Sequence, residues 1–366
     1  MRILLLSAYD ADSHRYWREN LVRHLECFEW RCLTLPPRHF SWRIRGNPIS
    51  WVSSCGERLS EPYDLLLATS MVDVATIKGL IPSLATTPTL VYFHENQFAF
   101  PVSAPQFVSA EPQMVNLYSA LAADINVFNS RFNLESFIDG VERLMARMPD
   151  QRPRDIGKVI REKSEVLPVP LENSVFERTR AAIRSELLTF AWNHRWEYDK
   201  APERLYRALH KFRQHGLPFR IHVLGRPFRK YPSVLDRLQQ DFAAELGQFG
   251  RMESRSDYLD VLRSSHVVIS TALQEFQGLS VLEATACGCI PLAPARLSHP
   301  EFLPKEFTYA SSPEDEEQEA GALARRLEEI AAAHANGALP QPPRVDAFSW
   351  NEMAPRYRRL IETTCR

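Results

Sequence analysis

Short, continuously apolar runs alternate with stretches of helical spacing along the chain, and this alternation constrains the fold more than any other feature. The first run, Arg2–Ser7 (RILLLS), has no polar alternation, which is typical of a strand buried on both faces of a sheet. The segment from Ser13 to about Phe28 follows and carries Trp17, Leu21 and Leu25 at intervals of four residues. Repetition of this order favours a parallel sheet with helices on both faces.

The strand–helix order restarts in the second half of the chain. The sequence therefore predicts an α/β protein with two doubly wound, Rossmann-like domains, residues 1–172 and 173–349, facing each other across a cleft. Further strands are predicted at Trp30–Leu35, Asp64–Thr69, Thr89–His94, Asp124–Asn129, Leu187–Asn193, Phe219–Leu224, His266–Thr271 and Cys289–Ala293. Helices are predicted at Ala201–His215, Ser233–Leu246, Pro313–Ala333 and Trp350–Thr364. Functional residues should directly follow strands, because ligands of such folds sit at the carboxyl ends of the strands.

Charge and targeting signals narrow the kinds of partner. The 366 residues contain 44 Lys and Arg against 45 Asp and Glu. This balance excludes a surface that is basic throughout, so any nucleic acid must bind to a local basic patch. The apolar N-terminal run is too short for a signal peptide, and no run approaches a membrane span. We expect a cytoplasmic protein with no membrane partner and no evident obligate protein partner. None of its six cysteines forms a CxxC pair, which indicates thiols without a metal.

Residues 275–294 (EFQGLSVLEATACGCIPLAP) combine two carboxylates with the start of a helix. Glu275 follows a predicted strand, Gly278 and Leu279 begin the helix, and Glu283 lies within it. Backbone N–H groups at a helix N-terminus attract anionic or oxygen-rich ligands, and carboxylates accept hydrogen bonds from sugar and ribose hydroxyls. Two glutamates by themselves would more often belong to a solvated helix face.

Taken whole, this segment resembles the E-x7-E motif, E-x-F-G-L-x-x-x-E-A-x-x-x-G-x-P, of retaining nucleotide-sugar glycosyltransferases with the GT-B fold. The matching residues are Glu275, Gly278, Leu279, Glu283, Ala284, Gly288 and Pro291. Phe276 stands one place early, and Gln277 occupies the usual aromatic position. The resemblance implies that Glu275 contacts the donor sugar, that Glu283 binds the ribose, and that residues 275–279 belong to the donor site.

A second element supports the donor site. The predicted strand Leu187–Asn193 ends just before Arg195 and Lys200, which resemble the R-x4-K element of the same family. By this resemblance the two cations neutralise the donor diphosphate, whose departure develops negative charge that fixed cations stabilise. Asn193 and, after the next strand, Gly225 and Arg226 are further predicted donor contacts. Residues 249–258 lie where the family usually docks the nucleotide base.

The N-terminal half supplies the predicted acceptor side. Strand Thr89–His94 ends in a cluster of polar residues, and the family places a histidine that points at the transferred sugar at a comparable strand end. The predicted catalytic residues are accordingly His94, Arg195, Lys200 and Glu275. The loop Ser7–His14 replaces a glycine-rich loop of the family. The predicted acceptor contacts of the cluster and the loop are Ser13, His14, Glu95, Asn96 and Gln97.

Five stretches narrow the resemblance further: YFHENQFAFP (92–101), FNSRFNLESF (128–137), LPVPLE (167–172), WNHRWEYDKAPE (192–203) and LGRPFRKYP (224–232). With them the chain resembles, over essentially its whole length, the family of tRNA-queuosine α-mannosyltransferases. The resemblance implies transfer of mannose from GDP-mannose to queuosine in the anticodon of tRNA-Asp. It also implies an acceptor-binding N-terminal domain, a donor-binding C-terminal domain and a final helix (350–366) that crosses back onto the N-terminal domain.

Two basic segments permit contact with RNA. Residues 36–51 carry arginines and no acid, interleaved with aromatic residues, and cations with aromatics suit an unpaired anticodon loop. The predicted acceptor contacts here are Arg38, Trp42 and Arg43, and the other members of the pattern are Phe40, Arg45 and Trp51. Residues 145–163 form the second basic segment. The alternative interpretation is that both are solvated basic loops.

Neither a metal ion nor another cofactor is expected beside the nucleotide sugar. Two other functions remain open from the residues. One is a glycosyltransferase whose acceptor is a small molecule, a glycan or a lipid. The other is a catalytically idle RNA-binding module on an inherited scaffold.

Overall fold

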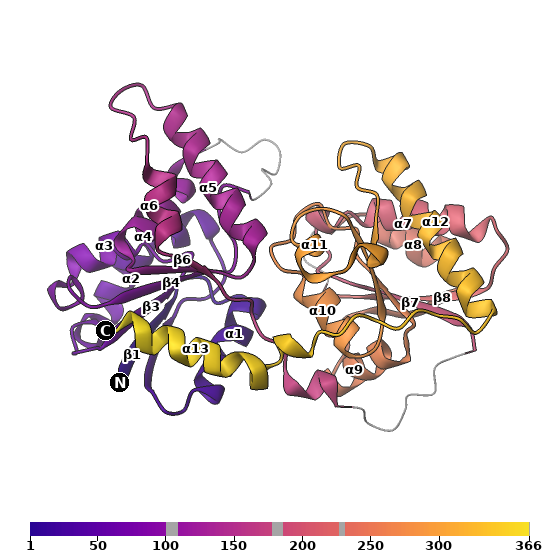
Figure 1. Cartoon of the computed structure of the whole chain (residues 1–366), viewed down its shortest axis with the longest axis horizontal. Coiled ribbons are helices and arrows are strands. Elements are labelled where there is room, and N and C mark those ends of the chain that lie inside the picture. The colour runs from indigo at the N-terminus through magenta and orange to yellow at the C-terminus, as the bar shows by residue number, and fades with distance from the viewer. Residues whose placement is uncertain (100–108, 178–185, 227–230, 366) are drawn as a thin grey trace. The chain divides into compact units, whose positions relative to one another are not determined.

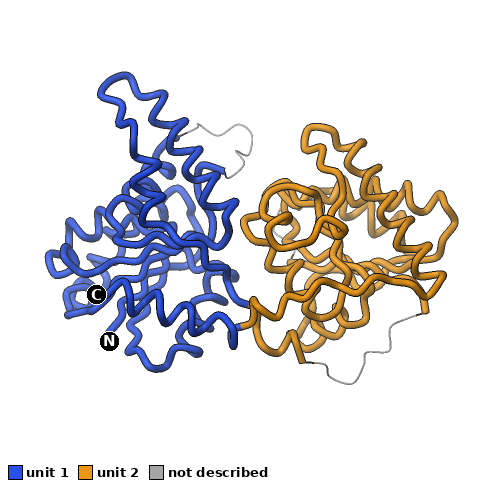
Figure 2. The backbone as a smooth tube through the Cα atoms, in the orientation of Figure 1, with its two compact units in different colours: residues 1–170, 350–366 blue, residues 171–349 orange. Residues whose placement is uncertain are grey.

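The computed structural model describes residues 1–99, 109–177, 186–226 and 231–365. The chain forms two compact units, coloured separately in Figure 2: unit 1 comprises Met1–Pro170 and Trp350–Arg366, and unit 2 comprises Leu171–Ser349. Residues 100–101 of the stretch YFHENQFAFP and residues 227–230 of LGRPFRKYP lie outside the described residues. No helix in the described part of the chain is both long enough and apolar enough to cross a membrane.

Unit 1 is built on a parallel sheet of six described strands in the order β2-β1-β3-β4-β5-β6. The strands are β1 (Arg2–Ser7), β2 (Glu29–Thr34), β3 (Leu65–Thr69), β4 (Thr89–Phe93), β5 (Ile125–Phe128) and β6 (Ser164–Val166). Every residue of β3 and β4 is buried, as the unbroken apolar runs predict for central strands covered on both faces.

The helices of unit 1 are α1 (Asp12–His24), α2 (Phe40–Leu59), α3 (Val74–Leu80), α4 (Glu111–Ala122), α5 (Arg131–Ala146), α6 (Ile156–Glu162) and α13 (Trp350–Thr364). The last helix, α13, buries Trp350, Met353 and Tyr357 on one face and lies against α1 and β4 (Figure 1). Near its end, Cys365 hydrogen-bonds the carbonyl of Asp64, whose carboxylate accepts from the backbone of Arg2. The two ends of the chain therefore lie close together within unit 1.

Unit 2 repeats the architecture with six described strands in the order β12-β11-β10-β7-β8-β9, again parallel. The strands are β7 (Leu188–Asn193), β8 (Phe219–Leu224), β9 (Leu246–Gly250), β10 (Val267–Ile269), β11 (Ile290–Pro294) and β12 (Thr308–Tyr309). The helices are α7 (Pro202–Arg213), α8 (Val234–Asp241), α9 (Arg255–Ser264), α10 (Leu279–Ala286), α11 (His299–Phe302) and α12 (Glu316–Ala335). Helices α7 and α12 pack side by side (Figure 1).

One sequence prediction of secondary structure is corrected. The predicted helix Ser233–Leu246 ends at Asp241, and Leu246 instead begins strand β9, which pairs with β8 and contains two glycines that disfavour a helix. The basic segment 36–51 is helical over most of its length, because α2 begins at Phe40 and continues through it, so the alternative interpretation as a loop does not hold there. The second basic segment contains the short helix α6.

Candidate active site

The donor-side residues of unit 2 follow strands that lie next to one another in the sheet. Asn193 ends β7, Gly225 follows β8, and the loop 270–278 connects β10 to α10. Because the strands are parallel, their carboxyl ends share one edge of the sheet. Gly225 has φ +148°, and a Cβ atom there would lie 2.0 Å from the carbonyl oxygen of His194, so this close approach requires glycine.

Lys200 and Glu275 form a buried ion pair at this edge. The Lys200 ammonium lies 3.1 Å from Glu275 Oε2, 3.2 Å from Asp199 Oδ2 and 2.7 Å from the carbonyl oxygen of Gln274. Two hydrogen bonds hold these segments together: the Leu273 backbone N–H donates to the Asp199 carbonyl over 2.7 Å, and the Thr271 hydroxyl donates to the Lys200 carbonyl over 2.7 Å. An ammonium has three donors, so protein acceptors already occupy all three of Lys200.

Both members of this pair are charged at neutral pH. Burial raises the pKa of Glu275, but the Lys200 charge, the neighbouring His194 and His299 and the hydrogen bond from Lys200 together bring the pKa to about 2. Burial likewise lowers the pKa of Lys200, and the charges of Glu275 and Asp199 return it above the ordinary value. In contrast, burial and then the Lys200 charge lower the pKa of His194 to about 3, so this histidine beside the pair is neutral.

The remaining diphosphate candidates differ in exposure. The side chain of Arg195 is 54% exposed and pairs with Glu197 at 3.1 Å, so its guanidinium can reach a ligand. Arg226 is exposed as well.

Gly278 caps α10 with φ +83°, a left-handed conformation that favours glycine, and Leu279 begins the helix. The first backbone N–H groups of α10 therefore lack partners within the helix.

Glu283, the predicted ribose ligand, is held by two residues of the α9 segment. The Tyr258 hydroxyl donates to Glu283 Oε2 over 2.5 Å, and Arg255 forms an ion pair with Oε1. Asn193 Nδ2 in turn donates to the Tyr258 hydroxyl over 2.6 Å. Hydrogen bonds and an ion pair therefore join the end of β7, helix α9 and helix α10 in one polar network.

The aromatic and amide positions of the motif are both buried. Phe276 is 7% exposed and Gln277 3% exposed, so each packs within unit 2 beside the loop. Gln277 therefore occupies the aromatic position of the motif without opening it to solvent.

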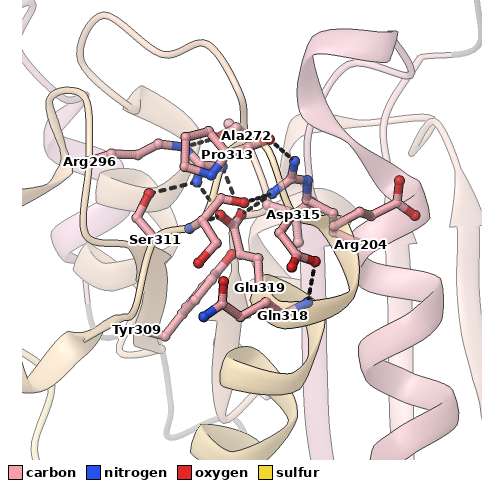
Figure 3. Close-up of polar contacts among 12 residues, drawn as sticks. Arg204, Ala272, Arg296, Tyr309, Ser311, Pro313, Asp315, Gln318 and Glu319 are labelled. Atoms are coloured by element: carbon pink, nitrogen blue, oxygen red, sulfur yellow. Dashed lines mark hydrogen bonds and ion pairs between the residues drawn. The ribbon is translucent and has the colours of Figure 1, made fainter.

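A buried cluster of ion pairs holds the loop 270–278, which carries Glu275. Figure 3 shows Arg204 on α7 and Arg296 after β11, with both guanidinium groups directed at Glu319 in the first turn of α12. Arg296 also donates to the carbonyl oxygen of Ala272 over 2.8 Å, three residues before Glu275, and Ser298 donates to the carbonyl of Glu275 over 3.3 Å. The loop that carries Glu275 is therefore fixed on both sides.

On unit 1, the predicted catalytic histidine lies in an aromatic box. His94 stacks on His14 with ring centroids 4.2 Å apart and meets Trp17 edge-on at 4.9 Å and Tyr92 at 4.7 Å. Burial and then His14 lower the pKa of His94 well below its ordinary value, so the imidazole is neutral. Its Nε2 atom has no hydrogen-bond partner among the described residues.

Glu95 orients the other histidine of the stack. Its Oε2 lies 2.9 Å from His14 Nε2, and its Oε1 accepts from the Ser70 hydroxyl over 2.8 Å. Ser13, the residue before His14, is exposed at the start of α1. The atypical first loop of the sequence therefore contributes a histidine to the His94 site.

The next residue of the cluster has a different role. Asn96 is fully buried; its amide nitrogen donates to Asn133 and Ser136, and its oxygen accepts from the backbone of Phe98 and Ala99. The prediction of an acceptor contact is wrong for Asn96, because its amide is used within unit 1. Gln97 is half-buried, and its backbone N–H donates to Asn116 over 2.9 Å.

The predicted RNA-binding segment is only partly available. Trp42 is 51% exposed on α2, and Arg38 before the helix is exposed. Arg43 is 9% exposed and its Nε donates to the Pro36 carbonyl, which leaves little of it for a phosphate. The idea that Trp51 stacks a base is wrong, because Trp51 is 1% exposed and belongs to the core.

Sequence reasoning missed the partners of the predicted residues. Tyr258 and Arg255 lie 25 and 28 residues from Glu283, and Arg296 lies 23 residues from Glu319. The one signal in the sequence is the position of residues 249–258, where the family usually docks the nucleotide base, and it gives no role to individual residues.

Comparison with known proteins first defines the class. Residues 176–349 match the family model of group 1 glycosyl transferases. The whole chain is similar in structure to sucrose-phosphate synthase from Thermosynechococcus elongatus (TM-score 0.71, 16% identity, 99% of this chain and 98% of that chain). It is also similar to Anabaena HepE in complex with UDP (TM-score 0.67, 14% identity, 99% and 100%). The fold is the predicted GT-B fold, and the protein is a glycosyltransferase.

Two further matches define the family within this class. Residues 2–171 match the model described as tRNA-queuosine alpha-mannosyltransferase N-terminal. A Drosophila melanogaster protein named tRNA-queuosine alpha-mannosyltransferase is 31% identical over 318 residues, which are 85% of this chain and 84% of that protein. The chain belongs to the tRNA-queuosine α-mannosyltransferase family, as its five sequence stretches predict.

Proposed function

We propose that this protein transfers mannose from GDP-mannose to queuosine in the anticodon of tRNA-Asp, with retention of the anomeric configuration. The observation that carries the proposal is the match of residues 2–171 to the N-terminal domain model of this family, together with the Drosophila relative that matches 85% of the chain. The donor-side geometry of unit 2 supports the chemistry.

Unit 2 holds the donor in this proposal. The diphosphate lies at the N-terminus of α10, where backbone N–H groups meet it and Arg195 supplies an exposed guanidinium. Lys200 adds a buried positive charge, but its three donors bind Asp199, Gln274 and Glu275. Its first task is therefore to fix Glu275, and its charge acts on the diphosphate through space.

Glu275 positions the sugar. Its carboxylate is ionised at neutral pH, since its pKa is about 2, and Lys200 occupies one of its two oxygens. Acceptor capacity remains for sugar hydroxyls. Because the loop is fixed by Arg296 and Ser298, this capacity is presented in one orientation.

Unit 1 carries the proposed acceptor residues. The neutral imidazole of His94 is the proposed contact to the transferred sugar. Glu95 holds His14 beside it, and Arg38 and Trp42 supply a cation and an exposed ring for the anticodon loop.

The reaction breaks the bond between the anomeric carbon and the diphosphate oxygen and forms a bond to a queuosine hydroxyl. It proceeds on one face of the sugar through an oxocarbenium-like state, and the departing phosphate takes the proton of the acceptor hydroxyl. No side chain acts as a covalent nucleophile, and no metal ion or other cofactor is required.

Labelled GDP-mannose and two pools of bulk tRNA test this proposal. One pool comes from cells that make queuosine and the other from cells that cannot. Label in the queuosine-containing pool alone is the expected result. Label in both pools or in neither, with a folded protein that binds the donor, would contradict the proposed acceptor.

A further inference from the structure

The carboxylate of Glu283 is bound by the protein on both of its oxygens. Tyr258 donates to Oε2 over 2.5 Å and Arg255 pairs with Oε1, yet the Glu283 side chain keeps 16% of its surface exposed. A carboxylate offers about four lone-pair positions, and these two contacts use two of them, one on each oxygen. One acceptor position per oxygen remains, which fits two hydroxyls on adjacent carbons.

The direction of the Tyr258 hydrogen bond is determined by its second partner. The amide nitrogen of Asn193 donates to the Tyr258 hydroxyl over 2.6 Å, so the single phenolic proton is left for Glu283. Burial and the neighbouring Glu283 charge raise the pKa of Tyr258 well above its ordinary value, so the proton stays in place.

Arg255 restrains the carboxylate from the other side. Its guanidinium pairs with Glu283, lies 3.4 Å from Glu172 Oε2 and sits 5.0 Å above the Tyr258 ring. Two donors at roughly opposite ends of a carboxylate hold its plane, and charge-assisted hydrogen bonds of this kind are about twice as strong as neutral ones. Asn193 then links this carboxylate to the end of β7, two residues before Arg195.

We propose that Tyr258 and Arg255 are positioning residues for the nucleoside: they hold the Glu283 carboxylate in the one orientation that accepts the vicinal 2′- and 3′-hydroxyls of the ribose. This inference rests on the proposed function, which takes Glu283 as the ribose ligand. Through Asn193, Tyr258 also keeps the ribose carboxylate in register with the strand end that leads to the diphosphate cations.

Calorimetric binding of GDP and UDP, each compared with its 2′,3′-dideoxy counterpart, tests the proposal in the full-length protein. The wild-type protein should prefer the ribonucleotide. Tyr258→Phe should lower this preference about tenfold, as expected for loss of one hydrogen bond to a charged group, and leave dideoxynucleotide affinity unchanged. Tyr206→Phe is the matched control, because Tyr206 also donates to a carboxylate, that of Asp241, and should keep the full preference.

Two further variants separate the possible failures. Glu283→Ala should abolish the ribose preference; if it does not, Glu283 is not the ribose ligand and the proposed donor site fails. If Glu283→Ala abolishes the preference but Tyr258→Phe keeps it, the positioning role is overturned. Arg255→Met, at a side chain 44% exposed, gives an independent test should Tyr258→Phe unfold. It should lower the ribose preference, Arg255→Lys should restore part of it, and an unchanged preference in Arg255→Met would also overturn the proposal.

Discussion

Glu319→Gln should destabilise unit 2 strongly, because the substitution removes the charge of the carboxylate that pairs with both the Arg204 and the Arg296 guanidinium groups. The side chain of Glu319 is 1% exposed, and those of Arg204 and Arg296 are 5% and 11% exposed. Glutamine keeps the shape and one acceptor but leaves two cations without a buried counter-charge. Breaking a buried ion pair in this way costs about 3–5 kcal/mol.

A loss of this size is measurable as a shift of the unfolding temperature. For a domain as long as unit 2, each kcal/mol of lost stability lowers Tm by about 2–4 °C, so Tm should fall by about 10 °C. The assay is thermal unfolding followed by circular dichroism, at fixed protein concentration. Glu317→Gln on the same helix is the control: Glu317 pairs with Lys211 at the surface and its loss should leave Tm unchanged. Equal transitions for the two variants would refute the assignment of Glu319 as the central anion.

Three other predictions follow from the donor site. Arg195→Ala should lower kcat about a hundredfold or more, as loss of a donor to developing charge does, while Tm stays the same; steady-state kinetics with near-wild-type kcat would contradict its role. His194 is neutral in the folded protein (pKa about 3) but titrates near 6.5 when unfolded. It therefore makes the free energy of unfolding fall by up to about 1.4 kcal/mol per pH unit as the pH drops from about 6.5 toward 3. His194→Asn should flatten the dependence of Tm on pH in that range, and parallel curves of Tm against pH for the variant and the wild-type protein would contradict this. Transfer should be undiminished in EDTA, and a loss restored by Mg²⁺ or Mn²⁺ would show that a metal is required.

Local pattern was sufficient to predict the elements that carry the site. The runs around Leu5, Leu67 and Val91 are continuous apolar strands of a parallel sheet, and their burial depends on composition that any window of the sequence shows. Gly278 and Gly288 both adopt positive φ at the two ends of α10. These features are determined by neighbours along the chain.

The errors arose where distant residues decide the outcome. Asn96 resembles an exposed polar residue after a strand, but its amide is satisfied by Asn133, 37 residues away, and by the backbone of its own turn. Trp51 alternates with arginines in the sequence, yet helix α2 turns it toward the core. Tyr258 has no motif at all; its role follows from contacts with residues 25 and 65 positions away.

Nucleoside analysis of one purified tRNA-Asp tests the central claim most directly. The tRNA is prepared in two forms, with queuosine or with guanosine at the same anticodon position, and each is incubated with the protein and GDP-mannose before digestion and mass spectrometry. The account predicts that queuosine is converted to its mannosylated form with an α linkage, and that the guanosine form is unchanged. Unmodified queuosine in the presence of a folded, donor-binding protein, or a β linkage in the product, would contradict it.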